Sequence, residues 1–150
     1  MKKSTKVALW IIFIAYCAVM LYMLFSRTAS ETRNYNLVPF KTIGEFWTVL
    51  RQSAGVEYAE ALFMFSLANL LGNVLLFIPL GFFPALLRKK QKSARGVFVF
   101  CAVAVIAVEL AQYATGLGSA DIDDFILNML GAAIGWGLYA LGSRILRRGE

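Results

Sequence analysis

The sequence predicts an all-α integral membrane protein with four membrane-spanning helices. Hydrophobic residues make up 59% of the chain and charged residues only 16%, whereas soluble domains usually carry about 25% charged residues. Four apolar stretches each approach or exceed the roughly 18–20 residues that cross a bilayer as a helix. We therefore expect one membrane domain over residues 1–150, with helices at about 7–25, 61–87, 97–115 and 121–143.

Basic residues set the expected orientation of the four helices. They precede the first helix, crowd the segment between the second and third, and follow the fourth. Segment 116–120 has none, and segment 26–60 balances its four basic residues with four acidic ones. Because Lys and Arg accumulate on the cytoplasmic side, we expect both termini in the cytoplasm and these two segments outside. The net charge of +6 follows from this topology and gives no argument for a nucleic-acid partner.

The first helix begins like a secretory signal. Three lysines precede it, and Thr28, Ala29 and Ser30 offer small residues near a cleavage position. However, its apolar run is longer than the roughly 7–15 residues of a signal core. We therefore expect an uncleaved first helix that anchors the chain.

The first outer segment contains one amphipathic stretch. Ile43, Phe46, Trp47 and Leu50 follow the i, i+3, i+4, i+7 spacing of a helix with one apolar face. Pro39 suits the start of such a helix, because its missing N–H has no helical partner there. We expect a short helix over 40–51 on the outer face of the bilayer, with Trp47 toward lipid or toward the bundle. A lid packed on the bundle is a compatible alternative.

Prolines and glycines shape the second and fourth helices. Pro79 removes a backbone hydrogen bond from the second helix, so we expect a kink or a wider turn there. Gly131 and Gly135 in the fourth helix have GxxxG spacing, which favours close packing of two helices. Within one domain we expect this pattern to mark an internal contact rather than a dimer.

Glu109 is the residue that points most clearly to function. It lies inside an apolar run, where a carboxylate at the bilayer centre costs roughly 2.5–3.5 kcal/mol and tends to face protein, water or a polar partner. Helical rise places it about 9 Å below the outer end of its helix. Asn128 lies roughly 10 Å deep, Asn69 about 12 Å deep and Asn73 one turn deeper, so all are expected in the outer half of the membrane. With Gln112, one turn later, these side chains are predicted to form the floor of one outer-leaflet pocket. The alternative is that they only hydrogen-bond one another, for about 1 kcal/mol each.

Three aspartates stand at the outer start of the fourth helix. Asp121 can cap this helix, and Asp124 follows three residues later, as in a capping box. We expect Asp123 and Asp124 at the mouth of the same pocket. Arg27 or Arg33 would then lie near the head group of a ligand.

No metal or cofactor site is expected. A hard cation needs six or more oxygen ligands, and the aspartates show no spaced set of this kind. Cys17 and Cys101 lie in apolar runs without paired spacing, so neither a disulfide nor a zinc site is expected. The chain has no histidine, which excludes a Ser-His-Asp triad and a histidine proton relay.

Several ordered motifs resemble one family. They are Asn36-Leu37-Val38-Pro39-Phe40, then Asn69-Leu70-Leu71-Gly72-Asn73 with Pro79 and Gly81, then Glu109-Leu110-Ala111-Gln112, then Asp121-Ile122-Asp123-Asp124-Phe125 with Asn128 and Gly131. In this order and spacing the chain resembles the VanZ-like family of bacterial membrane proteins, from Asn36 to the fourth helix. The resemblance implies a multi-pass protein of the bacterial plasma membrane with a cell-envelope role, since the family is named after a protein linked to teicoplanin resistance in Gram-positive bacteria. It implies no known reaction.

Three function classes remain open. The first is a protein that binds a lipid or a lipid-tailed glycopeptide in an outer-leaflet groove and contributes to teicoplanin-type resistance. The second is a membrane-embedded enzyme acting on a lipid-linked envelope precursor, with Glu109 and one aspartate of 121–124 as acid and base. The third is a small transporter or flippase component, which would need to oligomerise. We favour the first, with membrane lipids, a lipid-linked cell-wall precursor or a lipoglycopeptide as partner, and leave a homo-oligomer open.

Overall fold

The computed structural model describes residues 2–26, 35–52, 57–88 and 93–148. Over these residues the chain forms five helices: α1 (Lys3–Phe25), α2 (Lys41–Gln52), α3 (Glu57–Leu87), α4 (Ala94–Thr115) and α5 (Ile122–Arg148). It also forms two short strands, β1 (Tyr35–Asn36) and β2 (Ala120–Asp121). The helices α1, α3, α4 and α5 are long and apolar enough to cross a membrane. The predicted all-α fold, with four spans and a short helix between the first two, is therefore confirmed.

The helices extend beyond the apolar stretches that predicted them. α1 begins at Lys3, α3 begins at Glu57, and α5 continues to Arg148. Apolar runs mark the part of a helix that suits hydrocarbon, whereas backbone hydrogen bonding continues into the polar residues on either side. Pro79 and Pro84 lie inside α3 without ending it.

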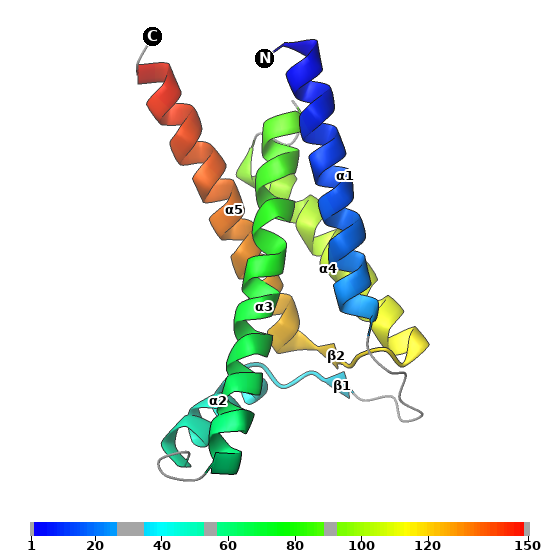
Figure 1. Ribbon diagram of the computed structural model, residues 1–150, viewed down its shortest axis with the longest axis vertical. Coiled ribbons are helices and arrows are strands. Elements are labelled where there is room, and N and C mark those ends of the chain that lie inside the picture. The colour runs from blue at the N-terminus through cyan, green and yellow to red at the C-terminus, as the bar shows by residue number, and fades with distance from the viewer. Residues whose placement is uncertain (1, 27–34, 53–56, 89–92, 149–150) are drawn as a thin grey trace.

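The first helix begins, and the last helix ends, at the same end of the bundle. Figure 1 shows the start of α1 and the end of α5 at one end of the molecule, with α2, β1 and β2 gathered at the opposite end. An even number of spans requires this arrangement. We call the end that carries α2 the outer end, as the charge pattern predicts; which end faces the cytoplasm stays a prediction.

α3 and α5 cross with almost no side chain between their backbones. A Cβ atom on Gly131 or Gly135 would overlap a carbonyl oxygen of α3, and one on Gly81 would overlap the backbone of Ala132. Close backbone approach of this kind stabilises helix pairs in membranes, where lipid provides no hydrophobic force between them. The expectation that the GxxxG spacing marks an internal contact is confirmed.

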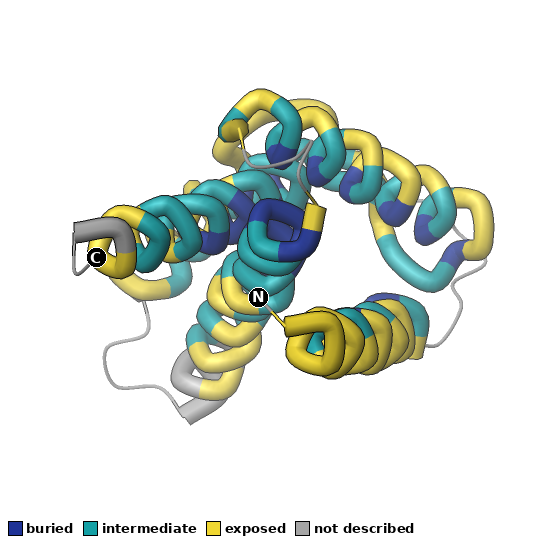
Figure 2. Tube along the Cα trace, turned by 90° about the horizontal axis from the view of Figure 1, so that it is seen from above, coloured by how far each residue is buried: buried dark blue, intermediate teal, exposed yellow. Residues whose placement is uncertain are grey.

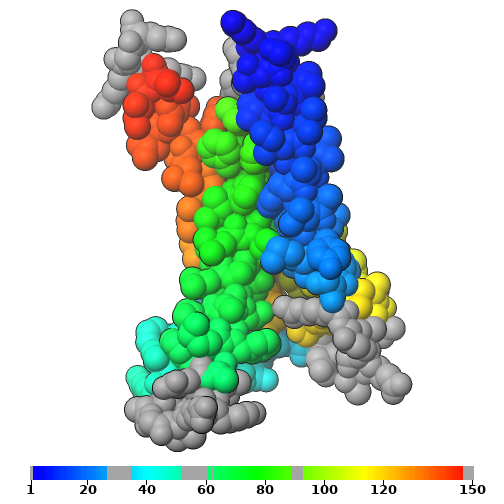
Figure 3. Space-filling model, in the orientation of Figure 1, coloured from blue at the N-terminus to red at the C-terminus, as the bar shows by residue number. Residues whose placement is uncertain are grey.

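α1 is the most exposed of the four spans. Only 11% of its apolar window is buried, against 28% or more in the other three. Figure 2 shows its outward face exposed, and Figure 3 shows it along the flank of α3. The ring of Phe13 stacks on Phe83 of α3 with 5.4 Å between centroids, and the Tyr16 hydroxyl donates to the Leu76 carbonyl. In a bilayer the remaining apolar face of α1 would contact lipid tails.

The outer end contains a short strand pairing that the sequence did not predict. β1 and β2 pair in parallel, with Tyr35 opposite Ala120 and Asn36 opposite Asp121. Strands of two residues are too short to show the alternation that identifies a strand in a sequence. The pairing brings the segment before α2 against the start of α5.

α2 begins one residue later than predicted, at Lys41. Pro39 lies in the preceding turn, so the expectation that it opens the helix is wrong. The physical reason is Phe40, whose φ of 64° is left-handed and therefore not helical. α2 packs on α3 through Phe46, whose ring stacks on Phe63 with 5.5 Å between centroids. The predicted amphipathic helix thus lies against the bundle, while its position at the bilayer surface stays a prediction.

Candidate functional site

Four polar side chains join β1, α2 and α5 in what we call the polar junction: Asn36, Thr42, Asp121 and Asp123. Asp123 is fully buried, with 0% of its surface exposed. One of its carboxylate oxygens accepts the N–H of Phe40 at 2.5 Å, and the other accepts the N–H groups of Thr42 at 2.8 Å and Ile43 at 3.2 Å. N–H groups at the start of a helix have no acceptor within it, and a negative charge suits a helix N-terminus. Asp123 on α5 therefore caps α2.

Asp121 holds the same junction from the residue before α5. Its Oδ1 atom accepts the Nδ2 group of Asn36 at 3.0 Å and the N–H of Asp123 at 2.9 Å. Its Oδ2 atom accepts the hydroxyl of Thr42 at 2.7 Å. The bond from Asp123 is the N-cap that the sequence predicted for this helix. All four carboxylate oxygens of Asp121 and Asp123 thus accept protein donors, and the junction is a closed contact.

Glu109 and Asn73 reach the same part of α5 from two other helices. The Oε2 atom of Glu109 on α4 accepts the N–H of Asp121 at 3.2 Å. The Nδ2 group of Asn73 on α3 donates to Oδ1 of Asp124 at 2.5 Å. The structure therefore brings Glu109, Asn73, Asp123 and Asp124 together around the start of α5.

The remaining predicted residues lie in other environments. The Nε2 group of Gln112 donates to the carbonyl of Leu24, near the end of α1, at 3.0 Å. Asn128 is 2% exposed, and its Oδ1 atom has no hydrogen-bond partner in the described part of the chain. Arg27 and Arg33 lie outside the described residues. Asn69 is distinct from all of these, because it lines two open cavities.

Two cavities flank the outer half of α3. The α2–α3 cavity has a volume of about 450 Å³, and the α1–α3 cavity has a volume of about 250 Å³. Phe65 and Asn69 line both, and Asn73 lines the second. The α2–α3 cavity is lined by Thr42, Glu45, Phe46, Thr48, Val49, Phe65, Ser66, Asn69 and Leu70.

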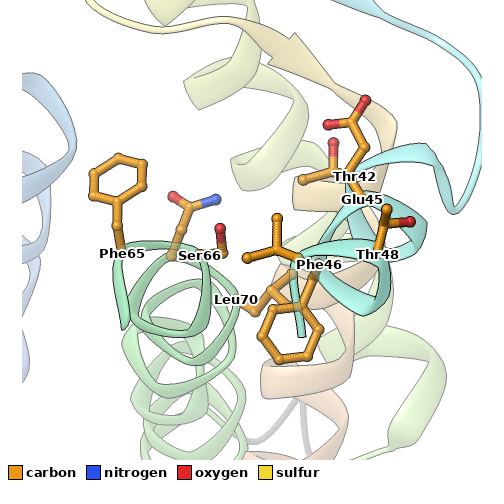
Figure 4. Close-up of a pocket in the computed structure, with 9 residues that line it drawn as sticks. Thr42, Glu45, Phe46, Thr48, Phe65, Ser66 and Leu70 are labelled. Atoms are coloured by element: carbon orange, nitrogen blue, oxygen red, sulfur yellow. The ribbon is translucent and has the colours of Figure 1, made fainter. Parts of the chain in front are cut away.

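Figure 4 shows how the α2–α3 cavity mixes polar and apolar side chains. Thr42, Glu45 and Thr48 extend from α2, while Phe65 and Ser66 extend from α3. Hydroxyl, amide and carboxylate groups can orient a polar head group, and aromatic and aliphatic walls can hold hydrocarbon. Over the described residues, no group of three or more His, Cys, Asp or Glu side chains is placed to hold a metal ion.

Glu109 borders a different and smaller hollow. This groove has a volume of about 140 Å³ and lies between α4, α5, β2 and Leu37, the residue after β1. It is lined by Leu37, Ile106, Glu109, Leu110, Ala120, Asp121, Ile122 and Phe125. Among these three hollows of the described chain, Glu109 therefore shares none with Asn69 or Asn73.

Four polar residues of the α2–α3 cavity were not selected from the sequence: Thr42, Glu45, Thr48 and Ser66. The first three recur every third residue on α2, a spacing that predicts only the polar face of an amphipathic helix. Ser66 precedes Asn69 by three residues and Asn73 by seven, so all three share one face of α3. That shared face was the available signal.

Comparisons with known proteins agree with this architecture. A family model described as VanZ/LLP1 matches residues 10–145 of the chain. Among curated proteins, Protein VanZ of Enterococcus faecium is 26% identical over 123 residues, which cover 82% of this chain and 63% of that relative. The matched region therefore spans less than two thirds of the relative's length. No solved structure matches the chain.

Proposed function

Because the chain belongs to the VanZ/LLP1 family, we propose that it is a cell-envelope membrane protein that binds an amphiphile in the α2–α3 cavity. The amphiphile is a lipid or a lipid-tailed glycopeptide. The observation that carries the proposal is the cavity itself, which places amide, hydroxyl and carboxylate groups beside apolar walls at the outer end.

The size of the cavity supports this function. Ligand pockets in proteins usually measure about 300–1,000 Å³, and the α2–α3 cavity measures about 450 Å³. Phe46 and Leu70 supply hydrocarbon contact, while Ser66 and Asn69 supply hydrogen-bonding groups within the same space. An amphiphile, which has a polar head group and a hydrocarbon tail, can make both kinds of contact.

The position of the cavity supports entry from the bilayer. Phe65, which lines it, is 72% exposed, and Met64 beside it is 60% exposed. Apolar side chains this exposed on a membrane-spanning helix would contact lipid. A ligand whose tail is already in the outer leaflet could therefore reach the cavity sideways, without leaving the membrane.

Teicoplanin-type resistance is the cellular role that we propose for this binding. A glycopeptide whose tail is held at the membrane would be withheld from the cell wall. Of the predicted site residues, Asn69 and Asn73 line cavities and fit a ligand-binding role. Asp121 and Asp123 fit an acid–base enzyme less well, because all their carboxylate oxygens already accept protein donors.

A photoactivatable lipid tests the proposal. The purified protein is reconstituted in vesicles that contain a diazirine-tailed phospholipid, and crosslinked peptides are mapped by mass spectrometry. We expect crosslinks to concentrate on α2 and the outer half of α3. Ser66→Phe, which fills the α2–α3 cavity, should reduce this yield.

Ala107→Phe is the matched control, because Ala107 is exposed on α4 and lines none of the three hollows described above. It should leave crosslinking to α2 and α3 at the wild-type level. Crosslinks spread evenly over all lipid-facing helices, with no effect of Ser66→Phe, would overturn the proposed binding site.

A further inference from the structure

The charge lining the α2–α3 cavity is opposite to the charge of the whole chain. The chain carries 15 Lys and Arg against 9 Asp and Glu, for a net charge of +6. Within the part of the chain that the structure describes, the cavity is lined by one carboxylate, that of Glu45, and by no Lys or Arg. A ligand that enters it therefore meets a negative site in a positively charged protein.

From this contrast, and resting on the proposed function, we infer that the amphiphile bound between α2 and α3 carries a protonated primary amine, with Glu45 as its counter-ion. The source that fits best is an aminophospholipid of the bilayer. The cavity lies beside exposed apolar residues of α3, so lipids already in the membrane are the ligands nearest to it.

The Glu45 carboxylate is available to a ligand. It is exposed and lines the cavity, and Figure 4 shows it beside Thr42, across from Phe65 and Ser66. In the described part of the chain no ion pair joins it to Lys41, which lies one turn earlier on the same helix. An exposed glutamate on an amphipathic helix is ordinarily a solvated surface residue. Glu45 differs because it also lines a cavity.

The other lining groups also suit an ammonium ion. An ammonium group has three N–H donors and no acceptor. The carboxylate of Glu45 and the hydroxyl of Thr48, which both line the cavity, can each accept one. The rings of Phe46 and Phe65 add faces that attract cations. A head group with only phosphate charge would instead meet like charge at Glu45.

The experiment compares two lipids that differ only at the amine. Phosphatidylethanolamine and N-acetyl-phosphatidylethanolamine with identical chains are titrated onto the detergent-solubilised protein, and bound lipid is measured by native mass spectrometry. We expect about three- to fivefold tighter binding of the free amine, the upper part of the range for an accessible ion pair. Glu45→Gln should bring the ratio of the two affinities close to one.

Arg51→Gln controls for general surface charge, because Arg51 lies on the same helix but does not line the cavity. It should leave the preference for the amine unchanged. Equal binding of the two lipids to the wild-type protein, or a preference that survives Glu45→Gln, would overturn the inference while leaving amphiphile binding intact. If instead neither lipid binds better to the wild type than to Ser66→Phe, the proposed function itself fails.

A competition arm identifies the source of the amine. Teicoplanin is added to the protein loaded with phosphatidylethanolamine. Retention of the lipid supports the aminophospholipid as ligand. Displacement that occurs in the wild type and not in Glu45→Gln overturns that source and assigns the amine to the glycopeptide.

Discussion

The polar junction and the α2–α3 cavity lie side by side at the outer end, and their carboxylates differ in burial and in hydrogen bonding. In the junction Asp123 is fully buried and accepts three backbone N–H groups. In the cavity Glu45 is exposed and faces open space of about 450 Å³. Thr42 belongs to both, since its hydroxyl binds Asp121 and its side chain also lines the cavity.

This difference separates residues that build the site from residues that can meet a ligand. The acidic motif at 121–124, which carries much of the family resemblance, fixes where α2 begins and thereby sets one wall of the cavity. The groups that line the cavity come from α2 and α3 instead. In the described structure Asp121 and Asp123 therefore act as hydrogen-bond acceptors that hold the outer end together.

The comparison requires both regions to face outside, and labelling gives an all-or-none test. Cysteines are introduced at Ser119 or Ser93, both exposed, in a chain from which Cys17 and Cys101 have been removed. Because basic residues cluster near Ser93 and are absent from 116–120, we expect an impermeant maleimide to label only Ser119→Cys in intact cells. Labelling of Ser93→Cys alone would show that the chain has the opposite orientation in the membrane.

Removal of the Asp123 carboxylate should cause the largest loss of stability. Asp123→Ala leaves the N–H groups of Phe40, Thr42 and Ile43 without their acceptor. Hydrogen bonds to charged groups contribute about 1.5–3 kcal/mol each and are not additive, so we expect the free energy of unfolding to fall by about 3 kcal/mol or more. Reversible unfolding in detergent micelles, followed by circular dichroism, measures this change.

Asp123→Asn is the graded control for this prediction. Its single amide oxygen can replace only part of the carboxylate, so its unfolding free energy should lie between those of Asp123→Ala and the wild type. Wild-type stability of Asp123→Ala would show that the junction does not hold α2.

Glu109→Gln and Asn69→Leu distinguish the groove from the cavity. The amide oxygen that Glu109→Gln introduces could still accept the N–H of Asp121, so this substitution should cost no more than about 1 kcal/mol of stability. In a deletion strain that the native protein protects from teicoplanin, we expect Glu109→Gln to protect and Asn69→Leu to fail at equal protein levels. Loss of protection by Glu109→Gln alone would place the ligand at the groove beside α4.

Glu45→Gln should have the smallest effect on stability. Glu45 is exposed, and such substitutions usually change the free energy of unfolding by no more than about 0.5 kcal/mol. The same substitution is expected to abolish the preference for an amine. It should therefore change ligand selectivity while leaving stability almost unchanged. A destabilisation above about 1 kcal/mol in the same unfolding assay would make Glu45 part of the structure rather than the binding site.

The sequence predicted the elements that depend on local pattern. Four apolar stretches gave the spans, and the spacing of Ile43, Phe46, Trp47 and Leu50 gave α2, because hydrophobic periodicity needs no knowledge of neighbours. It also predicted Glu109 and Asn73 in the same half of the membrane, since helical rise is constant. Their depth in a bilayer stays a prediction.

The long-range contacts could not be predicted in this way. The N–H groups that Asp123 accepts belong to residues 80 to 83 positions earlier in the chain. The acidic motif itself contains no signal that predicts these partners. The left-handed Phe40 follows from the same contact, because most residues avoid that conformation without an outside constraint. Glu45 likewise becomes distinctive only when α3 is placed opposite it.

The cap on α2 also implies an order of assembly. Phe40 and Thr42 precede their acceptor Asp123 by 83 and 81 residues, and ribosomes add about 5–20 residues per second. The start of α2 must therefore wait about 4–17 s for its acceptor to be synthesised. During that interval the outer end of the nascent chain lacks this cap, so α5, the last of the four spans to be synthesised, completes the segment that joins the first two spans.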